Sequence, residues 1–97
     1  MTEEQKAMCV EQTKQALGIR SNARDKRIET IVESVVAEIK SIHGIELDLS
    51  DLSNLMFVVD YSAYRYGSNM DGNGVMPRHL QWRLHNLLIK EMGKNAT

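Results

Sequence analysis

The sequence predicts an all-α protein, a small bundle of about four helices with a Gly/Asn-rich loop between the third and the fourth. Apolar residues recur three and four positions apart over long segments, which is the spacing of one helix face. Capping residues and glycines stand at intervals of helical length, and no alternating strand pattern competes strongly. Because no linker or repeat divides the 97 residues, we expect one helical domain over residues 1–97.

The first helix is expected over residues 3–17. Thr2 and Gln5 have the spacing of a capping box, and Gly18 stands where the helix would stop. The apolar residues of this segment form an imperfect inward stripe, made up of Met8, Val10, Ala16 and Leu17. The sequence therefore defines the helix better than it defines the face that the helix buries.

The second helix, residues 23–43, has the clearest pattern in the chain. Asn22 and Asp25 are placed to cap its start, and Gly44 follows its end. Apolar residues recur at offsets of three and four, at Ile28, Ile31, Val32, Val35, Val36, Ile39 and Ile42. Although β-branched residues lower helix propensity, this spacing and a charged opposite face outweigh that cost.

The third helix is expected over residues 49–66. Its start is predicted from Asp48 as the cap, Asp51 at the third helical position, and Leu47 packed as a hydrophobic staple onto Leu52. The continuation, NLMFVVDYSAYRY, is apolar on nearly every face. Other helices, or another subunit, must therefore surround this helix.

The fourth helix is expected over residues 77–92, after Gly67 has ended the third. Pro77 suits the first helical position, where its missing N–H does no harm, and Gly93 is expected to end the helix. The inward face consists of Leu80, Leu84, Leu87 and Leu88. Trp82 lies on another face, so we expect it to be exposed or to lie in an interface.

Asp60 and Arg65 interrupt the apolar third helix, where a charge without a partner is costly. They are five positions apart and do not share a face, which predicts different partners. We expect Asp60 to pair with an arginine such as Arg27 or Arg83, inside the subunit or across an interface. Replacing Asp60 by Ala is then expected to impair folding or assembly.

The loop after the third helix contains half of a calcium-binding motif. Asn69, Asp71, Asn73 and Gly74 occupy positions one, three, five and six of a helix-loop-helix calcium loop. Position twelve, which needs a bidentate carboxylate, is Leu80. We therefore expect a polar Gly-rich corner that binds calcium weakly at most, and we assign no metal site.

No constellation of residues for catalysis or for a cofactor stands out. Cys9 is the only cysteine, and only Lys6 stands near it to stabilise a thiolate. His43, His79 and His85 are never three or four positions apart, so they do not form a zinc site on one helix face. The sequence therefore predicts no enzyme, no catalytic residue and no cofactor.

Charge is distributed unevenly along the chain, and no membrane segment is predicted. The N-terminal MTEEQKAM is too polar and acidic for a secretory signal, and no run approaches the roughly 20 apolar residues of a membrane span. Residues 1–76 carry 8 basic and 12 acidic side chains, whereas residues 77–97 carry 4 and 1. This small offset does not hold a polyanion, but it can orient a protein partner.

The run from Val58 to Leu87 carries motifs in a particular order: an aspartate-tyrosine pair, an arginine-tyrosine pair, a variable Gly/Asn/Asp loop, MP, and RLHN. With ALGI at the end of the first helix and the long second helix, this set resembles the head-tail connector, or neck adaptor, proteins of tailed bacteriophages. The resemblance covers most of the chain. The structural and interface candidates are Asp60, Tyr61, Tyr64, Arg65, Tyr66, Trp82, Arg83 and His85.

The resemblance implies a helical subunit without enzymatic activity or obligatory cofactor that assembles into a ring, typically of twelve copies, on the portal protein. A stopper or tail-completion protein binds below the ring. The expected location is the neck of the virion, after assembly in the host cytoplasm, and DNA passes through the lumen without sequence-specific binding. Relatives can dock on the portal through an extended C-terminal segment, whereas this chain ends four residues past Gly93.

The residues themselves point the same way. A small domain with a helix that is apolar on all sides is typical of a subunit that its neighbours complete. The acid-rich first three helices and the basic fourth helix can orient head-to-tail contacts. Because a DNA channel should not hold DNA tightly, we expect the residues that face the lumen to be polar or acidic.

Two other functions are alternatives at this point. A small calcium-responsive helix-loop-helix binding module would show shifts of the loop's amide resonances when calcium is added. A small DNA-binding regulator would use the fourth helix, in which Arg78, Gln81, Arg83 and Asn86 are base-reading types, and would bind duplex DNA in a salt-dependent way. The acidic remainder of the chain argues against the second alternative.

Overall fold

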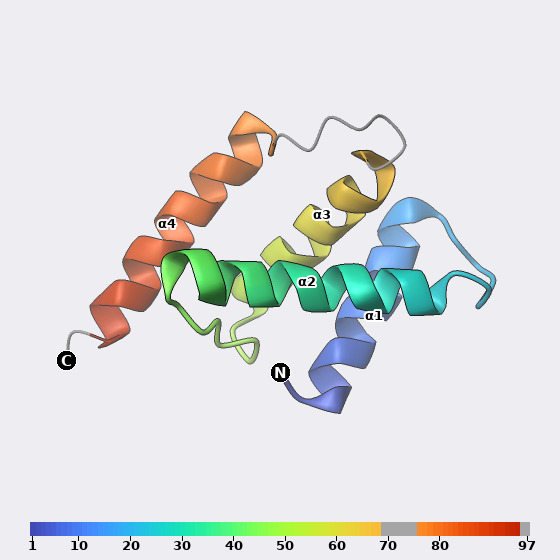
Figure 1. The fold of residues 1–97 in the computed structure, drawn as a ribbon, viewed down its shortest axis with the longest axis horizontal. Coiled ribbons are helices and arrows are strands. Elements are labelled where there is room, and N and C mark those ends of the chain that lie inside the picture. The colour runs from blue at the N-terminus through green and yellow to red at the C-terminus, as the bar shows by residue number, and fades with distance from the viewer. Residues whose placement is uncertain (69–75, 96–97) are drawn as a thin grey trace.

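The computed structural model describes residues 1–68 and 76–95, and these residues form four helices. The helices are α1 (Glu3–Leu17), α2 (Asp25–His43), α3 (Leu52–Ser68) and α4 (Arg78–Asn95), as Figure 1 shows. No strand occurs in the described ranges. The prediction of a small all-α bundle is confirmed, and each helix lies close to its predicted range.

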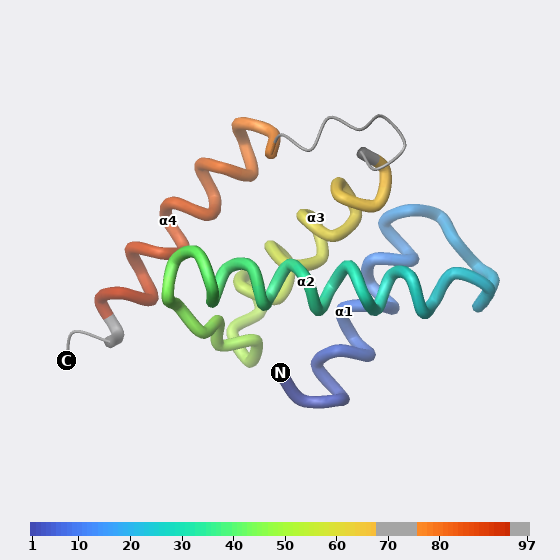
Figure 2. The backbone as a smooth tube through the Cα atoms, viewed as in Figure 1, coloured from blue at the N-terminus to red at the C-terminus, as the bar shows by residue number. Residues whose placement is uncertain are grey.

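The third helix is the centre of the molecule. α1 and α2 pack against each other and against α3, whereas α4 packs mainly against α3 alone. Figure 2 shows the consequence: α2 crosses the molecule, and α4 lies along one side of it, far from α1. α4 therefore has a large surface that none of the other three helices covers.

The core forms around α3 because this helix is apolar in several directions. Its buried residues include Phe57, Val58, Val59 and Tyr61, and α2 packs Ile28, Val32 and Val35 against them as the periodicity predicts. α4 contributes Leu80 and Leu87. Burial of apolar surface on this scale is the main favourable contribution to folding, so α3 is the element on which the fold depends.

The first two helices end at glycines, as predicted. Gly18 and Gly44 have φ angles of 73° and 68°, in the left-handed region that glycine adopts without strain. At the start of α1, the backbone N–H of Gln5 donates to the Thr2 hydroxyl at 3.0 Å, and the Gln5 side chain accepts from the Thr2 N–H at 3.0 Å. The predicted capping box is therefore confirmed.

Two predicted helix starts are wrong in detail. α2 begins at Asp25, because the Asn22 side chain does not cap it but accepts a hydrogen bond from Lys14 Nζ at 2.9 Å. α3 begins at Leu52, because Asp51 is its cap and accepts from the Ser53 backbone N–H at 3.0 Å. The predicted staple fails as well, since the Leu52 side chain is exposed.

The ends of α3 and α4 also differ from the prediction. Gly67 and Gly93 do not stop their helices, which continue to Ser68 and Asn95. Neither glycine has a positive φ, so both follow the helix at the moderate cost that glycine carries there. Pro77 precedes α4, and its carbonyl accepts from the backbone N–H groups of Leu80 and Gln81 at 3.0 Å.

The predicted inward stripe of α1 is also wrong in part, because Met8 and Ala16 are exposed. The helix instead buries Cys9, Thr13 and Lys14. The Thr13 hydroxyl donates to the Cys9 carbonyl at 2.6 Å, which allows a polar side chain to face the core.

Two isoleucines of α2 provide a test of this core. Ile28 is 0% exposed and Ile42 is 65% exposed. We expect Ile28→Val to lower the free energy of unfolding by about 1 kcal/mol, because a buried methyl group is lost from a packed site. Ile42→Val is the matched control and should change stability by a few tenths of a kcal/mol at most. Equal losses in urea unfolding would contradict this assignment of the core.

Candidate functional site

The junction between α3 and α4 contains the predicted partner of Asp60. Arg83 Nη1 lies 2.6 Å from Asp60 Oδ2, and the same guanidinium lies 5.6 Å from the centre of the Phe57 ring. The prediction of an arginine partner is confirmed, and the partner is Arg83, within the subunit. The two side chains are 41% and 39% exposed, so the pair lies at the edge of the core, and water screens it in part.

A second ion pair joins the other ends of the same two helices, and the sequence analysis missed it. Lys90 Nζ donates to Asp51 Oδ2 at 2.9 Å and to the Ser53 hydroxyl at 3.1 Å. The hydrogen bond from Lys90, followed by that from Ser53, lowers the pKa of Asp51 below its ordinary value. Asp51 thus caps α3 and holds α4 at the same time.

Next to the Asp51–Lys90 pair lies a buried polar contact. Asn54 Nδ2 donates to Glu91 Oε1 at 2.9 Å and to the Asp48 carbonyl at 3.0 Å. Both Asn54 and Glu91 are buried. Because buried polar groups need partners in fixed positions, this contact sets the register of α4 along α3.

Arg65 has different partners from Asp60, as predicted. Its guanidinium pairs with Glu38 of α2, donates to the Tyr61 hydroxyl at 2.8 Å, and lies 4.8 Å from the centre of the Tyr61 ring. The Tyr66 hydroxyl accepts from Arg24 Nη1 at 2.6 Å. Tyr64 is half-buried and packs against the core. These four candidates from Tyr61 to Tyr66 therefore join α3 to α2 or to the core.

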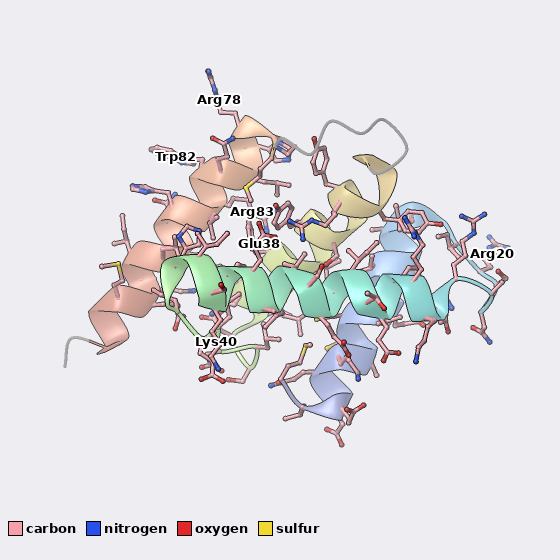
Figure 3. All side chains as sticks on the ribbon, viewed as in Figure 1. Arg20, Glu38, Lys40, Arg78, Trp82 and Arg83 are labelled. Carbon is pink, nitrogen blue, oxygen red and sulfur yellow. The ribbon has the colours of Figure 1, made fainter. Side chains whose placement is uncertain are left out.

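Trp82 and His85 lie instead on the side of α4 opposite to its buried leucines. We call this side the outer face of α4; it consists of Arg78, Trp82, His85, Ile89 and Met92, all exposed and spaced three or four residues apart. Trp82 is 66% exposed, and the His85 ring stacks on it at 6.1 Å between centres. Figure 3 shows Arg78 and Trp82 directed away from the other helices.

The outer face has the spacing that helices use when they pack against one another. Side chains at i, i+3, i+7 and i+10 form one stripe, as Trp82, His85, Ile89 and Met92 do here. Large apolar side chains exposed together mark sites of interaction more often than single ones. The outer face is therefore the candidate functional surface of the described chain.

Two lysines hold α1 against its neighbours, and the sequence analysis did not single them out. Lys6 Nζ lies within 3.3 Å of carboxylate oxygens of Glu3, Glu29 and Glu33, and the hydrogen bond to Glu33, then that to Glu29, raises the pKa of Lys6. The Lys14 side chain is buried, and its Nζ lies 2.8 Å from Asp25 Oδ1. These pairs position α1.

The described residues offer little for chemistry. Burial raises the pKa of the Cys9 thiol, which disfavours the reactive thiolate. In the described part of the chain no three His, Cys, Asp or Glu side chains gather where they could hold a metal ion.

Two of the α4 residues that could contact DNA bases already have partners within the subunit. Arg83 pairs with Asp60, and Gln81 Nε2 donates to the Met76 carbonyl at 2.7 Å. The predicted calcium half-motif, residues 69–74, lies outside the described residues.

A scan against protein-family models and searches of curated proteins and of solved structures find no match to this chain. Within the described ranges, none of the helices combines the length and the hydropathy that a membrane crossing requires.

The lowered pKa of Asp51 predicts a pH dependence of stability. A carboxylate with a lowered folded-state pKa stabilises the fold above its unfolded pKa of about 4, and this stabilisation is lost as the pH falls toward the folded value. Asp51→Asn keeps a capping side chain but removes the charge that pairs with Lys90. We expect its free energy of unfolding to fall less steeply than that of the wild type below pH 4, as measured by urea unfolding.

The control for this experiment is Glu46→Gln, at an exposed position without an ion pair in the described part of the chain. It should retain the acid dependence of the wild type. If Asp51→Asn loses stability below pH 4 as steeply as the wild type does, the pair with Lys90 does not contribute in solution.

The exposure of the Asp60–Arg83 pair predicts a small effect on folding. We expect Asp60→Ala to lower the free energy of unfolding by about 1 kcal/mol or less, because partly exposed ion pairs contribute little. A double-mutant cycle with Arg83→Ala measures the coupling directly. A coupling above about 3 kcal/mol would indicate instead a pair that behaves as fully buried.

Proposed function

We propose that this chain is a structural virion assembly protein, a ring-forming adaptor of the neck of a tailed bacteriophage. Its ring docks on the portal protein and joins the DNA-filled head to the stopper or tail-completion protein. DNA passes through the ring without sequence-specific binding, and the ring typically has twelve copies. No reaction is assigned to the protein.

The observation that carries the proposal is the contact between the two ends of the resembling run. The aspartate-tyrosine pair at its start lies on α3, and the RLHN sequence near its end lies on α4. Asp60 of the first motif pairs with Arg83 of the last at 2.6 Å. The motifs thus meet in space, where they set α4 across α3, and this supports the view that their order reflects one structural unit.

Two further features support the proposal. The chain exposes an apolar stripe on α4, which is a feature of subunits that neighbours complete. Both charged candidates on α3 form ion pairs within the subunit. Asp60 pairs with Arg83, and Arg65 pairs with Glu38. Such groups position helices and do not act on a substrate, which agrees with a structural function.

Electron microscopy tests the proposal. The chain is co-expressed with the portal protein encoded near its own gene, and purified portals are imaged with and without it. We expect the chain to add a ring-shaped layer with an open channel on one end of the portal. Portals that gain no layer at saturating amounts of the folded chain would contradict the proposal.

Asp60→Ala serves as the variant in this experiment, with Lys26→Ala as its control. Loss of the pair with Arg83 removes one of the contacts that fix the register of α4 on α3, so we expect fewer portals to carry a complete ring. The exposed Lys26 lies on α2, away from the α3–α4 junction, and its replacement should leave ring occupancy at the wild-type level.

A further inference from the structure

A groove between α1 and the start of α3 offers a surface that suits the outer face of α4. It has a volume of about 260 Å³ and is lined by Glu4, Gln5, Met8, Leu49, Ser50, Leu52 and Leu55. We call it the α1–α3 groove. Met8 and Leu52 are exposed on it, whereas Leu49 and Leu55 are buried. The groove is therefore an apolar depression with two large side chains left open to solvent.

The charges around the two surfaces are opposite. Glu4 lines the groove, Glu46 and Asp48 are exposed on the segment that leads to α3, and none of the seven lining residues is Lys or Arg. The outer face of α4 carries one formal charge, the positive charge of Arg78. Charge complementarity of this kind favours one orientation and disfavours contacts between like surfaces.

One molecule cannot bring its own two surfaces together. The inner face of α4 is fixed on α3 through Asp60–Arg83, Asn54–Glu91 and Asp51–Lys90, so the outer face is directed away from the body. Figure 1 shows α4 along one side, whereas the N-terminal end of α1 lies elsewhere on the molecule. The two surfaces can therefore meet only between molecules.

We propose that the outer face of α4 in one copy binds the α1–α3 groove of a second copy. Trp82 and Ile89 cover Met8 and Leu52, and Arg78 approaches the acidic edge of the groove. Every copy carries one of each surface, so the contact is head-to-tail, and it closes into a ring if the rotation between copies permits. This inference rests on the proposed function, because it names the contact by which the ring forms.

Two single variants separate the surfaces. Ile89→Asp places an acid on the outer face, where it is repelled by the acidic groove, and Leu52→Arg places a base in the groove, where it is repelled by Arg78. Both side chains are exposed, so both variants should fold, and circular dichroism and melting temperature verify this. Ile42→Asp, on an exposed residue of α2 that belongs to neither surface, is the control.

Sedimentation equilibrium of the wild type, up to about 1 mM, should show association that grows with concentration. Ile89→Asp and Leu52→Arg should each remain monomeric, and Ile42→Asp should associate as the wild type does. The decisive sample is the equimolar mixture of Ile89→Asp and Leu52→Arg. The first retains an intact groove and the second an intact outer face, so these two surfaces should bind each other. The two altered surfaces bring the acid introduced at position 89 opposite the base introduced at position 52, and these opposite charges attract, so the equimolar mixture should associate although each variant alone does not.

Three outcomes would overturn the inference. A wild type that stays monomeric up to about 1 mM shows that the two surfaces do not bind each other. Self-association of Leu52→Arg shows that the outer faces of two copies pair with each other. Wild-type association of Ile89→Asp shows that α4 contributes no contact.

The same variants separate this inference from the proposed function. If Ile89→Asp and Leu52→Arg still form complete rings on the portal, the ring exists and its contact lies elsewhere. If the mixture associates as expected but the wild type adds nothing to the portal, the contact is correct and the proposed function is wrong.

Discussion

The structure depends on one constraint, that α3 must be covered on nearly every side. Phe57, Val58 and Val59 point in different directions around the helix and are all buried. α1 and α2 cover two sides, and α4 must cover another. Because α4 has only α3 as its main support, its position relies on the polar contacts along their junction. None of the other helices in the described ranges covers its opposite side.

The polar residues of the junction therefore contribute more to geometry than to stability. Partly exposed pairs such as Asp60–Arg83 add little free energy. Two such pairs together with the buried Asn54–Glu91 hydrogen bond nevertheless allow one register of α4. A fixed register places Trp82, Ile89 and Met92 in one line on the exposed side. A surface that must fit a neighbour requires such a rigid placement.

The helices could be predicted because their signals are local, as the Thr2 capping box and the periodicity of α2 show. Contacts between residues far apart in the sequence could not be predicted. Asp51 and Lys90, for example, are 39 positions apart, and no spacing rule connects them. Asp60 required a partner, which predicted an arginine, but only the fold selects Arg83 over Arg27. The face of α1 was mispredicted because Lys14 and Thr13 are buried with polar partners, which a hydrophobic stripe cannot reveal.

The central claim is that α4 is held by one face and presents the other to a second molecule. Trp82 is the only tryptophan in the chain and lies on that outer face, so its fluorescence reports the claim directly. We predict ready quenching by acrylamide and a red-shifted emission in dilute protein, with protection and a blue shift as the concentration rises. A Trp82 already protected in the monomer, or equally quenched at every concentration, would contradict the account.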